Sequence, residues 1–211
     1  GYVGSAVADS FMHKDILIND PAHISTPIEI IKAECSAIFV CVPTPSDDFG
    51  NCDTSTLFSV LQSLEGYPGI VISKSTAPPN EYVEFEKMNL RLAHVPEFLT
   101  QARAKFDYVN PHKIVVGCDP ELRREVTDIL MYSNINFDRV KIEYCSIAEE
   151  SFFKYMANSM LAMKVVMNNE FYDVAQGLGL DWNSLTSIAS TDSRLGNTHW
   201  SVPGPDGRRG F

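Results

Sequence analysis

The sequence lacks the features that mark several large classes of protein. It has no C-x-x-C pair, no long uncharged apolar run, no dense basic cluster, no internal repeat and no low-complexity segment. Its cysteines are far apart, and three of them lie in or beside apolar runs typical of strands: Cys35, Cys41, Cys52, Cys118 and Cys145. This spacing favours reduced, buried thiols in a cytoplasmic protein, with Cys41 and Cys118 in the core, and we predict no metal site.

Charge and hydropathy argue against two kinds of partner. The net charge is −10, and the densest basic clusters are the pairs Arg123-Arg124 and Arg208-Arg209, so we predict no nucleic-acid partner. The longest uncharged part of the longest predicted helix, residues 155–163, is much shorter than the roughly 20 residues that span a bilayer. No signal peptide is visible, and we predict no membrane partner.

The length and the ends of the chain indicate how many cores it can form and whether it is part of a longer protein. With 211 residues and an apolar content of 45%, the chain can bury one core, or one core with a small annex. It begins with glycine rather than methionine and stops at Gly210-Phe211, directly after a loop rich in glycine, proline and arginine. We therefore expect a fragment of a longer protein.

A single long helix is predicted from Ser146 to Gly179. Ser146 and Glu149 have the spacing of a capping box, and Gly177 and Gly179 offer the left-handed conformation that ends helices. Apolar residues occur on every face between residues 152 and 167, so we expect this helix to run through packed protein.

Lys154 and Asn158 stand out within this apolar helix. Their four-residue spacing places a cation and an amide on one stripe of the helix. A buried lysine is costly unless a partner or a reaction uses its charge. Two interpretations stay open: Lys154 reaches solvent while Asn158 caps a neighbouring loop, or both side chains serve a functional cleft.

Apolar runs of strand length alternate with amphipathic segments before the long helix. Strands are predicted at 37–42, 69–73, 91–95, 113–118 and 140–143, and helices at 53–65, 80–88 and 119–132. This alternation predicts an α/β fold with a doubly wound, Rossmann-like, mostly parallel sheet, followed by the long helix and a small helical segment. We place one domain at residues 1–145 and a second at 146–211.

The first twenty residues have the pattern of part of a dinucleotide-binding unit. Gly1 and Gly4 fit the second and third glycines of G-x-G-x-x-G, a helix is predicted to about His13, and a buried strand at 15–20 is predicted to end in Asp20. Glycines at a helix N-terminus let a pyrophosphate approach the backbone, and a carboxylate about 20 residues further on binds the ribose. A tight strand-to-helix turn without any ligand would show the same two glycines.

Stiff or polar loops stand where a doubly wound sheet binds its ligands. Such sheets bind ligands beyond the carboxyl ends of their strands. The loops Pro43–Ser46, Lys74–Pro79 and Pro96–Leu99 follow predicted strands, and residues 204–211 form a further loop. Each of them alone is typical of an ordinary turn. All four in order, joined to a helix with Lys154, favour a binding site.

Seven motifs, taken in order, resemble one enzyme family. They are GYVG, CVPTP, KSTAPP, VPEFL, FFKYMANSMLAMKVVMNNE, DSRLGN and PGPDGRRGF, and the resemblance to the UDP-glucose/GDP-mannose dehydrogenase family covers nearly the whole chain. The resemblance implies an NAD-dependent oxidoreductase that oxidises the C6 alcohol of UDP-glucose to the carboxylate of UDP-glucuronate by two hydride transfers. It also implies a cytoplasmic homodimer formed through the long helix and a role in supplying precursors of acidic polysaccharide.

The resemblance assigns roles to individual positions. The residues that would bind NAD are Gly1, Tyr2, Val3 and Gly4 at the pyrophosphate, Asp20 at the adenosine ribose, and Val42, Pro43, Thr44, Pro45, Ser75 and Thr76 along the cofactor. The catalytic residues would be Thr76 beside the reacting carbon, Glu97 in the closing hydrolysis, and Lys154 with Asn158 at the reacting oxygen. The residues that contact the substrate would be Glu97, Phe98, Leu99, Lys154, Asn158, Arg194, Gly210 and Phe211.

Two departures from the family pattern bear on activity. Gln101 stands where the family has a second glutamate, and an amide cannot act as a base. The family's nucleophilic cysteine lies in G-F-G-G-x-C, whereas this chain stops at Gly210-Phe211, so we expect the isolated chain to be inactive. The first glycine of the fingerprint and the strand before it would lie upstream of Gly1, so we also expect the isolated chain to bind NAD weakly. The alternatives are a GDP-mannose or UDP-N-acetylhexosamine dehydrogenase, a β-hydroxyacid dehydrogenase, and a non-catalytic NAD-binding fragment.

Overall fold

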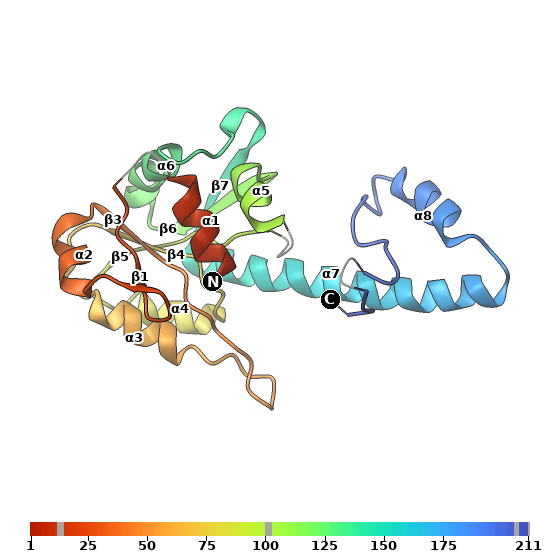
Figure 1. The fold of residues 1–211 in the computed structure, drawn as a ribbon, viewed down its shortest axis with the longest axis horizontal. Helices are drawn as coiled ribbons and strands as arrows, with labels where there is room; N and C mark the ends of the chain where they lie inside the picture. The colour runs from red at the N-terminus through yellow and green to blue at the C-terminus, as the bar shows by residue number, and fades with distance from the viewer. Residues whose placement is uncertain (12–14, 100–102, 205–206, 211) are drawn as a thin grey trace. The chain divides into compact units, whose positions relative to one another are not determined.

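The computed structural model describes residues 1–11, 15–99, 103–204 and 207–210 (Figure 1). Its elements are, in chain order, α1 (Tyr2–Ser10), β1 (Asn19–Asp20), β2 (Ile24–Ser25), α2 (Ile28–Glu34), β3 (Ala37–Val40), α3 (Ser55–Ser63), β4 (Ile70–Ser73), α4 (Pro79–Phe85), β5 (Arg91–His94), α5 (Ala104–Val109), β6 (Lys113–Cys118), the 3₁₀ helix η2 (Pro120–Leu122), α6 (Arg123–Met131), the 3₁₀ helix η3 (Phe137–Arg139), β7 (Lys141–Cys145), α7 (Ile147–Gly177) and α8 (Trp182–Ser190). The chain forms two compact units, Gly1–Lys154 and Tyr155–Phe211. The division into domains 1–145 and 146–211 stays a prediction.

The first unit is built on a five-stranded sheet with the order β3-β4-β5-β6-β7. The pairs β3–β4, β4–β5 and β6–β7 are parallel, while β5 and β6 pair antiparallel with Ala93 opposite Cys118. Parallel neighbours need a crossover connection, and α3, α4 and α6 lie in these connections. The predicted Rossmann-like, mostly parallel sheet is therefore confirmed.

Side chains of the central strands alternate between two cores, because successive residues of a strand point to opposite faces. Ile70 and Ile72 of β4 pack in a cluster with α1, α5 and α6, whereas Val71 packs in a second cluster with α3 and α4. Figure 1 shows these helices on the two sides of the sheet. Because helices cover both faces, the strand ends are left for polar side chains and ligands.

Gly117 in β6 allows the long helix to approach the sheet closely. A Cβ at this position would lie 2.8 Å from the Cβ of Glu150 and 3.0 Å from the Cα of Ile147. Glycine is required here, because a side chain would push the first turns of α7 away from β6.

The prediction of a buried strand at residues 15–20 is wrong. Asn19 and Asp20 form β1, which pairs antiparallel with β2 in a separate two-stranded ribbon, and residues 15–18 are not in a strand. A strand requires a ladder of hydrogen bonds to a neighbour, and residues 15–18 have no strand partner in the described part of the chain. Apolar composition alone does not supply that neighbour.

The predicted ends of the long helix are confirmed by its capping contacts. The Ser146 N–H donates to Glu149 Oε2 at 2.9 Å, and the Glu149 N–H donates to Ser146 Oγ at 3.2 Å. The backbone bond from Ser146, and then the bond from its hydroxyl, lower the pKa of Glu149. At the other end Gly179 has a φ of +70°, two residues after α7 ends at Gly177. No helix among the described residues combines the length and apolarity needed to cross a membrane.

The expectation that α7 runs through packed protein is wrong. Among the described residues, its apolar side chains are largely exposed: Phe152 by 62%, Met160 and Met163 by 64%, and Val166 by 60%. Lys154 is only 5% exposed, which contradicts the interpretation in which it reaches solvent. Periodicity identifies the apolar faces of a helix but does not determine what covers them.

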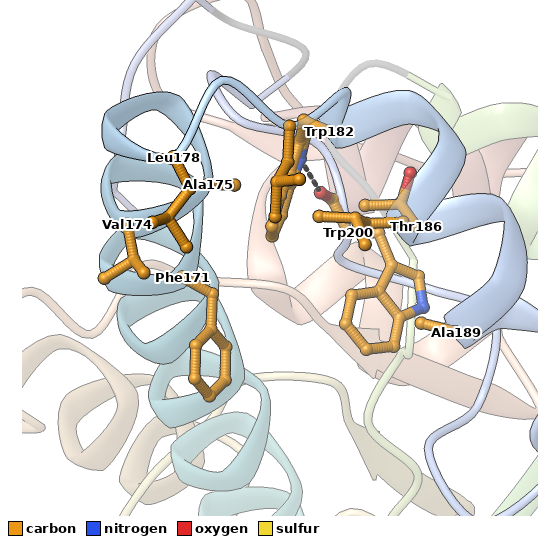
Figure 2. Close-up of a pocket in the computed structure, with 10 residues that line it drawn as sticks. Phe171, Val174, Ala175, Leu178, Trp182, Thr186, Ala189 and Trp200 are labelled. Atoms are coloured by element: carbon orange, nitrogen blue, oxygen red, sulfur yellow. Dashed lines mark hydrogen bonds between the residues drawn. The ribbon is translucent and has the colours of Figure 1, made fainter.

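The second unit contains the rest of α7, the helix α8 and the segment that follows it. Asp181 caps α8 by accepting hydrogen bonds from the N–H groups of Asn183 and Ser184. An apolar pocket of about 280 Å³ lies against α7 and α8, with Trp182 and Trp200 in its wall (Figure 2). None of the predicted site residues lines this pocket.

Candidate active site

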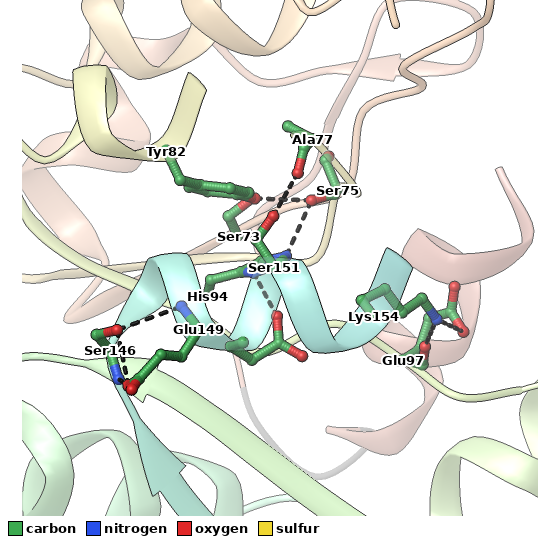
Figure 3. Close-up of polar contacts among 11 residues, drawn as sticks. Ser73, Ser75, Ala77, Tyr82, His94, Glu97, Ser146, Glu149, Ser151 and Lys154 are labelled. Carbon is green, nitrogen blue, oxygen red and sulfur yellow. Dashed lines mark hydrogen bonds and ion pairs between the residues drawn. The ribbon is translucent and has the colours of Figure 1, made fainter. Parts of the chain in front are cut away.

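Lys154 is buried against the loop that follows β5 (Figure 3). Its Nζ donates a hydrogen bond to the backbone carbonyl oxygen of Glu97 and lies 3.6 Å from the Glu97 carboxylate oxygen Oε2. The same Nζ is 4.6 Å from the centroid of the Phe98 ring. A carbonyl, a carboxylate and an aromatic face therefore offset the cost of burying the Lys154 ammonium away from water.

The loop that carries Glu97 is held by its own backbone and by a second lysine. The Leu99 N–H donates to Glu97 Oε2 at 3.0 Å. The Nζ of Lys113 in β6 lies 4.8 Å from the Phe98 ring centroid and 4.1 Å from that of Phe153 in α7. The Glu97 oxygen therefore faces both an N–H group and an ammonium, and the neighbouring Phe98 ring lies near two cations.

The turn after β4, from Ser75 to Ala77, is held by side chains from four other segments. All three of its carbonyl oxygens accept a hydrogen bond from a side chain. The contacts are Tyr82 Oη to Ser75 O at 2.7 Å, His94 Nε2 to Ser75 O at 3.1 Å, Thr44 Oγ1 to Thr76 O at 2.6 Å, and Ser151 Oγ to Ala77 O at 2.6 Å. Thr76 therefore sits in a turn whose backbone is fixed by α4, β5, α7 and the loop after β3.

The predicted cofactor residues gather in two places. The Ser75 Oγ donates to the Val42 carbonyl oxygen at 2.7 Å, which joins the loop Val42–Pro45 to the turn that contains Thr76. At the start of the chain, α1 begins with no side-chain cap, and the Asp20 carboxylate lies 3.7 Å from the backbone nitrogen of Gly1. The first N–H groups of an uncapped helix carry partial positive charge and suit an anionic group.

Lys74 is a buried lysine to which the sequence analysis gave no role. It directly follows β4, is 6% exposed, and holds its Nζ 5.1 Å from the centroid of the Tyr108 ring. Burial lowers the pKa of Lys74 to about 8, against the opposing attraction of Cys41, Glu97 and Glu150. Its neutral form is thus more accessible than that of an ordinary lysine.

Several predicted site residues lie apart from this cluster in the chain. Asn158 is half-buried one helical turn after Lys154 and belongs to the second unit, as do Arg194 and Gly210. Arg194 is exposed and forms a bidentate ion pair with Asp192, with Nη2 2.6 Å from Oδ2. Gln101 and Phe211 lie outside the described residues. The roles assigned to all these residues stay predictions.

Sequence reasoning missed His94, Lys74 and Lys113. His94 is the last residue of β5, Lys74 follows β4, and Lys113 is the first residue of β6. For His94 and Lys74 the position at the carboxyl end of a strand was an available signal, because a doubly wound sheet binds its ligands there. Lys113 stands at the start of its strand, where this rule gives no signal. A histidine or lysine next to an apolar run nevertheless looks in sequence like an ordinary polar residue at the end of a strand. The partner that buries it is distant in sequence, so no local pattern indicates the burial.

Two domain profiles of one protein family match the chain. The profile of the NAD binding domain covers residues 9–136, and that of the central domain covers residues 148–207. The chain belongs to the UDP-glucose/GDP-mannose dehydrogenase family. This family is one of oxidoreductases, and the matching domain identifies NAD as the cofactor. The resemblance predicted from the seven motifs is thereby confirmed.

Relatives of this dehydrogenase chain are considerably longer than the chain itself. The UDP-glucose 6-dehydrogenase of Rickettsia bellii is 28% identical over 171 residues, which cover 76% of this chain and 39% of the relative. A putative UDP-glucose 6-dehydrogenase of Bacillus subtilis is 28% identical over 185 residues, covering 82% of this chain and 42% of that protein. The chain thus spans less than half the length of these curated relatives.

Solved structures of other dehydrogenases share the fold. GDP-mannose dehydrogenase from Pseudomonas aeruginosa has a TM-score of 0.74 at 20% identity, over 96% of this chain and 57% of that one. UDP-glucose dehydrogenase from Pyrobaculum islandicum has a TM-score of 0.69 at 22% identity, over 93% and 51%. Mycobacterium tuberculosis 3-hydroxyisobutyrate dehydrogenase reaches 0.69 at 16% identity, over 99% and 74%. At such identities the likeness shows the fold alone.

Proposed function

We propose that the full-length protein containing this chain is an NAD-dependent nucleotide-sugar dehydrogenase that oxidises the C6 alcohol of UDP-glucose to UDP-glucuronate by two hydride transfers. The family membership and the relatives named UDP-glucose 6-dehydrogenase support this choice of substrate. NAD accepts the hydride, while residues of this chain supply charge, orientation and proton transfer.

The observation that carries the proposal is the buried contact between Lys154 and Glu97. Oxidation of an alcohol develops negative charge on its oxygen, and a preorganised ammonium in a dry site stabilises that charge. Lys154 is held by the Glu97 carbonyl and lies over the Phe98 ring, so little rearrangement is needed when the charge forms. Asn158, one helical turn further along α7, adds an amide donor that positions the substrate.

Glu97 and Thr76 have separate roles in this proposal. The Glu97 carboxylate activates the water of the closing hydrolysis, and the neighbouring ammonium and N–H group hold it in place. Thr76 lies beside the reacting carbon, and the fixed backbone of its turn keeps it there. The remaining substrate contacts would come from Phe98, Leu99, Arg194, Gly210 and Phe211.

The described residues fit NAD. The uncapped N-terminus of α1, formed by Gly1, Tyr2, Val3 and Gly4, suits the pyrophosphate, and the nearby Asp20 carboxylate suits the ribose hydroxyls. The loop Val42–Pro45 and the residues Ser75 and Thr76, which hydrogen bonds join, would line the rest of the cofactor.

Four of the five cysteines of this chain are poorly suited to the covalent step that the family reaction requires. Burial raises the pKa of Cys41 and of Cys145 to about 11, and it also raises the pKa of Cys35 and of Cys118. A raised pKa lowers the fraction of reactive thiolate. We therefore assign the nucleophile to none of these four residues, and we propose that the isolated chain does not turn over nucleotide sugars.

An assay of the full-length protein with a panel of alcohols tests the proposed function. UDP-glucose is expected to be the best substrate and to yield two NADH per sugar, because an alcohol becomes a carboxylate. GDP-mannose, UDP-N-acetylmannosamine and 3-hydroxyisobutyrate are the comparison compounds, chosen because proteins with this fold carry those names. Preference for another nucleotide sugar would refute the substrate, and a single NADH per hydroxy acid would refute the whole proposal.

We also propose that the protein forms a homodimer through α7. The exposed apolar side chains of Met156, Met160, Met163, Met167 and Phe171 form a large apolar surface, and such surfaces mark contacts between proteins. Light scattering of the chain is expected to give twice its mass of 23.5 kDa. Met163→Glu should restore the single mass, whereas Met131→Glu on the exposed surface of α6 should not. A single mass for the parent chain at all concentrations would contradict this interface.

A further inference from the structure

His94 and Glu150 form a buried pair beneath the candidate active site, and none of the roles proposed above uses it. The His94 Nδ1 lies 2.6 Å from the Glu150 carboxylate oxygen Oε2, and both side chains are 0% exposed. His94 ends β5, and Glu150 lies in α7 one helical turn before Lys154. The contact is short but is not aligned as a hydrogen bond: the His94 Nδ1 and both Glu150 carboxylate oxygens have no hydrogen-bond partner among the described residues.

The contacts of the His94 ring nitrogens determine where its protons are. The His94 Nε2 lies 3.1 Å from the carbonyl oxygen of Ser75, which can only accept a hydrogen bond, so Nε2 carries a hydrogen. The Nδ1 and the Glu150 oxygen cannot both present lone pairs to each other at 2.6 Å. One further proton therefore lies between them, and the pair is neutral overall whether that proton belongs to the imidazole or to the carboxyl group.

The pair connects the two parts of the candidate site. Through Nε2 it holds the carbonyl of Ser75, next to Thr76, and through Nδ1 it holds the helix that carries Lys154. The imidazole ring also packs on Tyr82, with ring centroids 4.2 Å apart, and the Tyr82 hydroxyl donates to the same Ser75 carbonyl at 2.7 Å. Figure 3 shows the His94 ring between the turn of Ser75 and α7, with Tyr82 beside the turn.

We propose that His94 and Glu150 are positioning residues, which hold the Thr76 turn and the helix of Lys154 in a fixed relation through a single shared proton. This inference rests on the proposed function, in which Thr76 and Lys154 act on the same substrate. Because the pair is neutral as a unit, it fixes the two elements without adding net charge beside the Lys154 ammonium.

Two substitutions of Glu150 separate this role from simple packing. Glu150→Gln keeps the shape and offers an N–H to the His94 Nδ1, so it preserves a hydrogen between the two side chains. Glu150→Leu keeps a similar volume but has no polar group. In the full-length protein, Glu150→Leu is expected to lower kcat about 100-fold, as misplacement of reacting groups by about 1 Å does, while Glu150→Gln should retain most of kcat. Glu149→Gln, on the exposed neighbouring residue, is the matched control and should leave kcat unchanged.

Imidazole NMR of the chain labelled with ¹⁵N-histidine gives a readout that packing alone does not affect. In the parent chain we expect a slowly exchanging Nε2–H of His94 and a second, low-field proton between its Nδ1 and Glu150. In Glu150→Gln the Nε2–H should remain, while Nδ1 should accept a hydrogen bond from the introduced amide. A parent chain without a proton between His94 Nδ1 and Glu150, equal turnover of the Leu and parent proteins, or equal loss in the Leu and Gln proteins would each overturn the inference. If Glu150→Leu does not fold, the NMR comparison of the parent and Glu150→Gln chains tests the inference instead. If the parent protein oxidises no nucleotide sugar, the proposed function fails, while the NMR result still decides whether the shared proton exists.

Discussion

Replacing Lys154 with methionine in the full-length protein is expected to lower kcat for UDP-glucose by about two to three orders of magnitude. The substitution keeps the length and apolar body of the side chain but removes the ammonium beside Glu97. A preorganised charge that faces a developing oxyanion acts mainly in the transition state, so the loss should appear in kcat and kcat/KM together. The KM for NAD should change little, because Lys154 is not among the residues assigned to the cofactor.

Steady-state NADH formation measures this effect, and circular dichroism with urea unfolding checks the fold. Lys87→Met is the control, since the Lys87 side chain is 65% exposed and pairs with Glu84 on the surface. It should leave both activity and stability close to those of the parent. A Lys154→Met protein that folds normally and keeps turnover within about tenfold of the parent would remove the central residue of the proposed mechanism.

Replacing Lys74 with methionine is expected to stabilise the 211-residue chain at pH 7 by about 1 to 3 kcal/mol. Lys74 is charged in a buried position, where burial lowers its pKa to about 8 from an ordinary value near 10.5. A difference of one pH unit in pKa corresponds to about 1.4 kcal/mol, so the buried charge costs on the order of 3 kcal/mol. Methionine fills a similar volume without that cost.

The pH dependence of this gain follows from the direction of the pKa shift. Between pH 8 and 10.5 the unfolded parent chain holds a proton on Lys74 that the folded chain has lost, so the stability of the parent rises with pH in this window. The advantage of Lys74→Met is therefore complete below pH 8 and shrinks as the pH approaches 10.5.

Urea unfolding of both chains at pH 6, 7, 8 and 9.5 measures this advantage, with Lys87→Met as the exposed control. The surrounding groups that titrate or carry charge are Cys41, Glu97, Glu150 and Lys154. An advantage of Lys74→Met that does not change between pH 7 and 9.5 would show that the gain does not come from removing the charge. A clear loss of stability at pH 7 would show that the Lys74 ammonium is favourably paired in the folded chain.

Local patterns in the sequence predicted most elements of the first unit. The runs around residues 38–40 and 70–73 became β3 and β4, because an apolar stretch of strand length needs only a neighbouring strand and a helix on each face. The same reasoning failed at residues 15–18, which have the composition of a strand but no strand partner among the described residues. Composition describes the segment, whereas a ladder depends on a second segment.

The candidate site was predictable in part. The rule that a doubly wound sheet binds ligands beyond the carboxyl ends of its strands located Thr76 and Glu97. The four-residue spacing of Lys154 and Asn158 in α7 singled out Lys154. The rule did not locate Glu150, which resembles the neighbouring Glu149 in sequence. Glu149 is a capping residue at the surface, while Glu150 faces β6 next to Gly117 and meets a histidine from another strand.

The sequence by itself determined the alternation of strands and helices, the capped start of α7 and the motifs of the UDP-glucose/GDP-mannose dehydrogenase family. These features depend on residues a few positions apart, whose geometry is fixed by the periods of the helix and the strand. Only the tertiary structure decided that the Lys154 ammonium meets the Glu97 loop, 57 residues away, and that His94 pairs with Glu150. It alone also decided that the apolar side chains of α7 are exposed within the described part of the chain. Such contacts depend on how the sheet orders its strands, which no local pattern encodes.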